Sequence, residues 1–219
     1  AEMLPLIEAS VCEHMELVGP AGAASLIRND GWIEVYPRHK DWMRAIAAAA
    51  GLSAHGLHHE VLDARALNER EPALTNLAGA IHWRDPLTSC DPGALTASYA
   101  RLFVERGGKL VKADALSLTN TGAGWSVGDG ASLCDAPDVV AALGPWSTDL
   151  CERLGYSFPM AFKRGYHMHY EGAQGAGLTH PVCDPEAGFV LAPMSRGVRL
   201  TTGIELADRD APSDLRQLG

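Results

Sequence analysis

Helical and strand-like patterns alternate along the first two thirds of this 219-residue chain, whereas its last third contains strand-like patterns alone. The spacing of apolar residues predicts helices over residues 8–28 (interrupted near Gly19-Pro20), 39–50, 64–70, 92–106 and 148–154. Apolar or alternating runs predict strands over residues 31–36, 78–83, 109–118, 139–143, 162–170, 189–192 and 198–206. A hairpin is predicted from residues 125–127 and 131–134 around Gly128-Asp129-Gly130. Helix–strand alternation followed by a run of strands predicts an α/β or α+β architecture.

The helix that follows residue 90 has clear signals at both ends. Asp91 is suited to cap its N-terminus, and Pro92 suits its first position, where no backbone N–H is needed. Gly107-Gly108 marks its end. Its predicted apolar face consists of Leu95, Tyr99, Leu102 and Phe103.

Charge and cysteine usage exclude several classes of protein. The 18 basic and 27 acidic residues give a net charge of −9, so a basic nucleic-acid-binding face is not expected. No apolar run approaches the roughly 20 residues of a membrane span, and the N-terminus has neither a signal-peptide pattern nor an initiator Met, which indicates a processed start. The five cysteines form no C-x-x-C pair, so they are expected to be free thiols in a reducing compartment.

The segment 139–147 is the most informative for function. Its short apolar run resembles a strand buried on both faces, and this run ends at Gly144, where a backbone can approach a ligand closely. Ser147 is then expected to cap the following helix. Ligands of α/β sheets bind at such strand ends, so one interpretation is a nucleotide or cofactor contact. The alternative is an ordinary strand–turn–helix connection with a capping serine.

The segment 163–170 is the second most informative for function. In a strand, Tyr166, Met168 and Tyr170 share one face, whereas His167 and His169 share the other. A pocket wall and a metal pair are both compatible with this pattern. Catalytic zinc normally needs three protein ligands, so no metal site is predicted.

The remaining motifs are weaker evidence of function. The group His58, His59, Glu60 and Asp63 resembles metal ligands, but a solvated loop is expected there. The glycine-rich stretch 172–177 is predicted to be a flexible loop. The sequence contains no G-x-G-x-x-G, no P-loop and no G-x-S-x-G.

Taken in order, several segments resemble the FAD-dependent amine and D-amino-acid oxidoreductases, especially the bacterial D-amino acid dehydrogenase-like branch. These segments are Arg70-Glu71-Pro72-Ala73-Leu74, residues 79–83 followed by Asp91-Pro92-Gly93, residues 140–147, Lys163-Arg164-Gly165-Tyr166, residues 188–193 and residues 200–203. Their order and spacing cover essentially the whole chain. Each motif is weak alone, and the ordered set indicates the superfamily far more specifically than any substrate.

The resemblance implies a substrate-binding domain with a large mixed β-sheet, plus an incomplete Rossmann-like FAD domain. Residues 1–90 and 156–206 would belong to the substrate domain, residues 91–155 would be part of the FAD domain, and residues 207–219 would form a tail or linker. FAD is the implied cofactor, and a small amino acid or amine is the implied substrate. The electron acceptor is not assigned.

The resemblance also implies site residues. Ala115 would contact the adenine through its backbone, and residues 142–146 would lie against the FAD phosphates or the isoalloxazine ring. The cofactor-side residues are Ala142, Gly144, Pro145, Trp146 and Arg164, the last as a cation that can neutralise an anionic ligand. The substrate-side residues are Tyr166, His167, Phe189 and Met194. Phe189 stands near a position where related oxidases often have a tyrosine, so a hydroxyl is missing here.

The departures from the family pattern concern both ends. No dinucleotide-binding fingerprint and no segment with a substrate-gripping arginine are present, so the chain resembles the middle of such an enzyme and is expected to be inactive alone. The implied reaction is hydride transfer from the substrate α-carbon to flavin N5, with no acid or base required from the protein, so no catalytic residue is named. Glycine, sarcosine or proline as substrate, and a non-catalytic binding module, remain alternatives. The expected location is the cytoplasm, or the inner membrane face as a peripheral protein.

Overall fold

The computed structural model describes residues 3–171, 177–214 and 216, and the chain divides into two compact units. The sheet unit comprises Ala1–Glu105, Gly165–Ile204 and Asp214–Gly219, whereas the small unit comprises Arg106–Arg164 and Glu205–Ser213. A unit boundary therefore falls after Glu105, and the helix beginning at Pro92 lies with the sheet unit.

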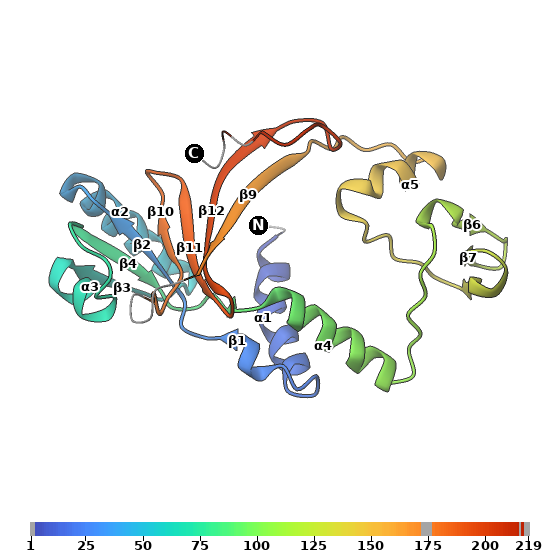
Figure 1. The fold of residues 1–219 in the computed structure, drawn as a ribbon, viewed down its shortest axis with the longest axis horizontal. Helices are drawn as coiled ribbons and strands as arrows, with labels where there is room; N and C mark the ends of the chain where they lie inside the picture. Colours follow the sequence, from blue (N-terminus) through green and yellow to red (C-terminus); the bar gives the residue numbers. More distant parts are fainter. Residues whose placement is uncertain (1–2, 172–176, 215, 217–219) are drawn as a thin grey trace. The chain divides into compact units, whose positions relative to one another are not determined.

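The sheet unit contains a seven-stranded mixed sheet in the order β3-β4-β2-β10-β11-β12-β9 (Figure 1). Its strands are β2 (Trp32–Tyr36), β3 (His59–Asp63), β4 (Gly79–Trp83), β9 (Lys163–Tyr170), β10 (Val182–Asp184), β11 (Phe189–Met194) and β12 (Gly197–Leu206), the ends of β9 and β12 lying in the small unit. β10 runs parallel to β2, whereas β2 with β4, β3 with β4, β10 with β11 and β11 with β12 are antiparallel. The predicted α/β class with a large mixed sheet is confirmed.

Two helices cover opposite faces of the sheet. The helices of this unit are α1 (Leu4–Val18), α2 (His39–Leu52), α3 (Ala64–Arg70) and α4 (Pro92–Glu105), with short 3₁₀ turns at Ala24–Leu26 and Ser53–His55 and a small pair β1 (Ile27–Arg28) and β5 (Thr88–Ser89). Leu67 of α3 packs with Ala80, whereas the indole of Trp42 in α2 lies against Gly79. Because neighbouring strand residues point to opposite faces, α3 and α2 cover different faces.

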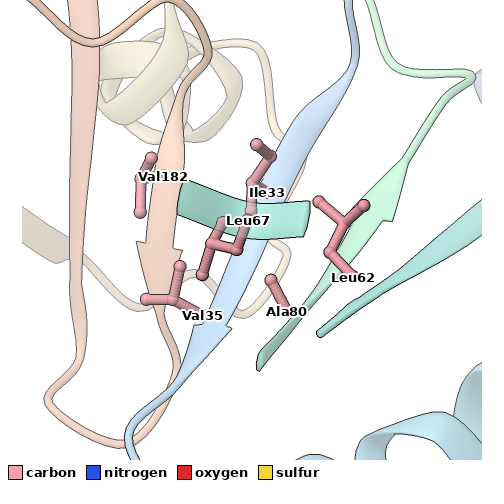
Figure 2. Packing of buried hydrophobic residues seen from close by; sticks show 6 residues of the cluster. All are labelled: Ile33, Val35, Leu62, Leu67, Ala80 and Val182. Atoms are coloured by element: carbon pink, nitrogen blue, oxygen red, sulfur yellow. The ribbon is translucent and has the colours of Figure 1, made fainter. Parts of the chain in front are cut away.

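The main core lies beneath α3. Ile33 and Leu62 are fully buried there, and Figure 2 shows how side chains from β2, β3, β4, β10 and α3 converge. The cluster consists of Ile33, Val35, Leu62, Leu67, Ala80 and Val182. A second cluster joins α1 to α4 through Val18, Ala21, Ala23, Leu95 and Leu102. The predicted cap of α4 is confirmed, because Asp91 Oδ1 accepts the N–H of Ala94 at 2.9 Å.

The small unit contains the antiparallel sheet β6 (Thr119–Asn120), β7 (Trp125–Val127) and β8 (Cys134–Ala136). It also contains the helix α5 (Ser147–Arg153) and 3₁₀ turns at Ala115–Ser117, Gly130–Ser132 and Gly144–Trp146. The predicted hairpin is present, with its second strand displaced toward the C-terminus. Leu118, Ser126 and Leu150 are buried.

Some predictions for local structure are wrong. Residues 139–143 form no strand, and Val140 is 87% exposed, because no described strand lies beside them to bury either face. Residues 109–118 also lack a strand and end in a 3₁₀ turn, where the Asp114 side chain accepts the N–H of Leu116. Ser147 is the first residue of α5 and makes no capping bond, since the preceding 3₁₀ turn already leads into that helix. Residues 59–63, expected as loop, form β3 because they pair with β4.

Candidate functional site

The four predicted substrate-side residues all lie in the sheet unit, on β9 and β11. Phe189 and Met194 are five positions apart on β11, so they face opposite sides of the sheet. His169 lines the same pocket as Met194, and His167 is two positions from His169 on the same side. His167 and Met194 therefore share one face of the sheet, whereas Tyr166 and Phe189 share the other, and β12 separates the two strands.

The Tyr166 side is partly covered by the C-terminal segment. The Tyr166 hydroxyl accepts the backbone N–H of Asp214 at 2.7 Å, so its oxygen already has a partner within the chain. Phe189 is half-buried and stands opposite Thr202 of β12.

The other side carries two histidines and a pocket. The rings of His167 and His169 meet edge to face, with centroids 5.6 Å apart. Among the described residues, no group of three or more His, Cys, Asp or Glu side chains is arranged to hold a metal ion. The pocket beside Met194 has a volume of about 240 Å³ and includes Arg196 and Arg199, which the sequence patterns did not single out.

The predicted cofactor-side residues all lie in the small unit. Ala115 begins a 3₁₀ turn, and Gly144, Pro145 and Trp146 form another that leads into α5. Gly144 has φ of 55°, a conformation that glycine adopts without strain, and nothing lies within 4 Å of where a Cβ would stand. Ala142 and Pro145 are exposed, and Trp146 is 56% exposed. This turn presents an open apolar surface.

Two arginines of the small unit are already paired, and one of them lies beside this turn. Arg209 donates to Asp149 at 2.8 Å and to Asp210 at 3.1 Å, while its guanidinium lies 6.0 Å from the Trp146 ring. Arg164 is paired with Glu205 and also donates to the backbone oxygens of Ala211 and Pro212. Both guanidinium groups therefore already contact carboxylates within the small unit.

A buried polar cluster in the sheet unit was not predicted as a unit. Glu71 is fully buried, and its carboxylate accepts both the N–H of Thr179 at 3.0 Å and the N–H of His180 at 2.7 Å. The Thr179 hydroxyl and Nδ1 of His180 donate to the same carboxylate. Burial alone would raise the pKa of Glu71, but these hydrogen bonds outweigh it and hold the pKa below its ordinary value. The only signal in the sequence is the Arg70-Glu71-Pro72 motif.

His82 extends this cluster and is held neutral. Its Nδ1 accepts from Nη1 of Arg70 at 2.8 Å, so its proton is on Nε2, which donates to the carbonyl of Asp30 at 2.6 Å. Burial is the main cause that lowers the pKa of His82, and the positive charges of Arg84, His180 and Arg70 lower it further against the bond to Asp30. Arg70 is in turn paired with Glu60 at 2.7 Å. The cluster ties residues 179–180 to α3 and β4.

Comparison with known sequences identifies a family. The family described as FAD dependent oxidoreductase, DAO, matches residues 1–218. A D-amino-acid oxidase from Bradyrhizobium diazoefficiens is 26% identical over 202 residues, which are 90% of this chain and 47% of that protein. The chain thus spans about half the length of this relative.

Solved structures share the fold. Glycine oxidase from Geobacillus kaustophilus superimposes with a TM-score of 0.80 at 17% identity, over 100% of this chain and 60% of that one. L-proline dehydrogenase from P. horikoshii gives 0.74 at 14% identity, over 94% of this chain and 58% of that one. In the described part of the chain, no helix has the length and apolarity needed to span a membrane. With the family match over residues 1–218, the chain belongs to the FAD-dependent oxidoreductases of the DAO family.

Proposed function

We propose that the intact enzyme to which this chain contributes oxidises D-amino acids. The observation that carries this proposal is the 26% identity to a D-amino-acid oxidase over 202 residues, within a family match that covers residues 1–218. The proposed role of this chain is the central portion of that enzyme, with most of the substrate domain and part of the FAD domain. We expect the 219 residues alone to bind FAD weakly and to show no turnover.

The residues of the small unit fit the apolar part of FAD. Gly144 leaves open space beside the turn, and Trp146 and Pro145 offer exposed apolar surface. When bound, FAD supplies the oxidation by accepting a hydride from the substrate α-carbon, and the imine product then hydrolyses to a keto acid and ammonia. Ala115, Ala142 and Arg164 complete the proposed cofactor side. The proposed role of Arg164 is indirect, because it donates to the backbone oxygens of Ala211 and Pro212 and so holds that segment in place.

The residues of the sheet unit are proposed to position the substrate and exclude water. The strands β9 and β11 provide Tyr166 and Phe189 on one face and His167 and Met194 on the other. Only one of these faces can line a single pocket, so the two pairs cannot serve one substrate site together. We assign no acid or base to the chain, because positioning over the cofactor and desolvation account for the protein's part.

A substrate screen on the intact protein tests this proposal. Reduction of an artificial electron acceptor is measured with D-alanine, L-alanine, glycine, sarcosine and proline, because this readout also detects secondary amines, whose oxidation releases no ammonia, and does not depend on whether the enzyme is an oxidase or a dehydrogenase. Preferential turnover of D-alanine supports the proposal. Turnover of glycine, sarcosine or proline alone would make that compound the substrate in place of a D-amino acid, and no turnover in a FAD-loaded protein would favour a non-catalytic module.

We further propose a cytoplasmic location or a peripheral one at the inner membrane face.

Two substitutions test the cofactor side in the intact protein. Gly144→Val forces a β-branched side chain into a left-handed backbone and into the open space of the turn, so FAD affinity should fall at least tenfold. Gly122→Val is the matched control, because Gly122 also has positive φ and open space but lies in another turn. Equal FAD affinity in the two variants would remove the turn from the cofactor site.

A further inference from the structure

The pocket beside Met194 is bounded by backbone segments that contact one another, and its lining contains more basic than acidic side chains. It has a volume of about 240 Å³ and is formed where the β11–β12 turn meets the start of α4 and the end of β9. Its lining consists of Cys90, Asp91, Pro92, Gly93, His169, Met194, Ser195, Arg196 and Arg199. This volume is below the roughly 300–1,000 Å³ typical of drug-sized ligands, so the pocket suits a small metabolite.

The frame of the pocket is fixed by backbone contacts. Ser195 donates to the carbonyl of Cys90 through its N–H at 2.9 Å and through its hydroxyl at 3.2 Å. Gly197 has φ of 110°, and a Cβ at this residue would stand 2.2 Å from the carbonyl oxygen of Tyr170. The backbone of the turn therefore lies in close contact with both neighbouring segments.

The charges of this pocket are not balanced within the described part of the chain. Arg196 and Arg199 both line it, and neither has an ion-pair partner among residues 3–171, 177–214 and 216. Nε of Arg199 is buried and has no hydrogen-bond partner among the same residues. Asp91 is the one acidic group in the lining, and its Oδ1 already accepts the N–H of Ala94. His169 adds a third potential donor.

The chain as a whole is acidic, and several of its other arginines are paired with carboxylates. The net charge is −9, and Arg70, Arg164 and Arg209 each contact a carboxylate. A guanidinium that lines a pocket without a carboxylate partner favours a bound oxyanion, because its N–H donors and charge both suit such a ligand.

We propose that this pocket binds a small oxyanion, a carboxylate or a phosphate group, held chiefly by Arg199 and assisted by Arg196. The site lies wholly within the sheet unit and does not depend on FAD or on the reaction proposed above.

Calorimetric titration of the 219-residue chain tests this site. Malonate and inorganic phosphate are titrated separately at constant ionic strength in a buffer free of both anions. At least one should bind saturably with one site per chain, and the anion that binds distinguishes a carboxylate ligand from a phosphate ligand. Arg199→Gln should weaken binding at least tenfold, and Arg199→Lys should weaken it less, because lysine keeps the charge but not the paired donors.

The control is Arg153→Gln, which makes the same change in net charge at an exposed position of α5 in the small unit. It should leave the affinity unchanged. Arg196→Gln, on the exposed turn, should lower affinity several-fold without threatening the fold. The proposal is overturned if neither anion binds saturably, or if Arg199→Gln and Arg196→Gln, folded by circular dichroism, bind as tightly as Arg153→Gln.

Discussion

Replacing Glu71 by alanine removes the acceptor on which four donors of residues 179–180 converge. The two backbone N–H groups, the Thr179 hydroxyl and Nδ1 of His180 all point at this fully buried carboxylate. The carboxylate itself is fully buried, so Glu71→Ala removes an acceptor for the backbone N–H groups of Thr179 and His180 that solvent does not reach in the folded chain. The segment before β10 would then lose its attachment to α3.

The magnitude follows from the type of contact. Hydrogen bonds to a charged group contribute about 1.5–3 kcal/mol each, but they are not additive when they share one carboxylate. Breaking a buried charged arrangement by removing one partner typically costs about 3–5 kcal/mol, which we take as the expected loss in free energy of unfolding. For a chain of this size, about 2–4 °C per kcal/mol gives a lowering of Tm by about 6–20 °C.

Urea unfolding followed by circular dichroism measures this loss. Glu69→Ala is the matched control, because Glu69 lies in the same helix α3 and, among the residues that the structure describes, pairs only with exposed Arg65. The control should change the free energy of unfolding by less than about 0.5 kcal/mol. If the free energy of unfolding falls by less than about 1 kcal/mol in Glu71→Ala, or by the same amount as in the control, then this carboxylate does not stabilise the contact between residues 179–180 and α3 as argued.

Two further predictions concern pH and backbone geometry. Because the folded-state pKa of His82 lies below the unfolded value of about 6.5, its contribution to stability is present above about pH 6.5 and is lost as pH falls toward the folded pKa. The urea midpoint should therefore fall on acidification from about pH 7.5 to 5, and His82→Gln should flatten this dependence; equal slopes would contradict it. Gly197→Ala should cost about 1–3 kcal/mol, since its φ is 110° and its Cβ would meet the Tyr170 carbonyl. Gly19→Ala, where nothing lies within 4 Å, should cost far less, and a comparable loss in both would disprove the clash.

Local signals predicted the local elements well. The Asp63–Pro72 stretch gave α3 with the bounds that the structure has, and Asp91-Pro92 gave the start of α4. These elements are specified by caps and by helical spacing within a few residues. The large mixed sheet came from the family resemblance rather than from periodicity.

The wrong and missing predictions concern residues whose partners are distant in the sequence. The apolar run 139–143 has the composition of a buried strand, but a strand needs neighbours, and none of the described residues supplies them. The contacts of Glu71 with residues 179–180 and the pocket that joins Asp91 to Arg199 each bridge about a hundred positions. Spacing within one segment carries no information about such pairs. The predicted strand ended at Ala192, so only the observed strand β11, which extends to Met194, shows that Phe189 and Met194 face opposite sides of the sheet.

The most direct test of the proposed oxidation is an anaerobic titration of the FAD-loaded intact protein with each enantiomer of alanine. The visible absorbance of the flavin reports its reduction without any assumption about the electron acceptor. D-alanine should bleach this absorbance at a rate that saturates with substrate, and L-alanine should leave it unchanged at the same concentrations. Bleaching by L-alanine alone, or by neither enantiomer, would contradict a D-amino acid oxidoreductase.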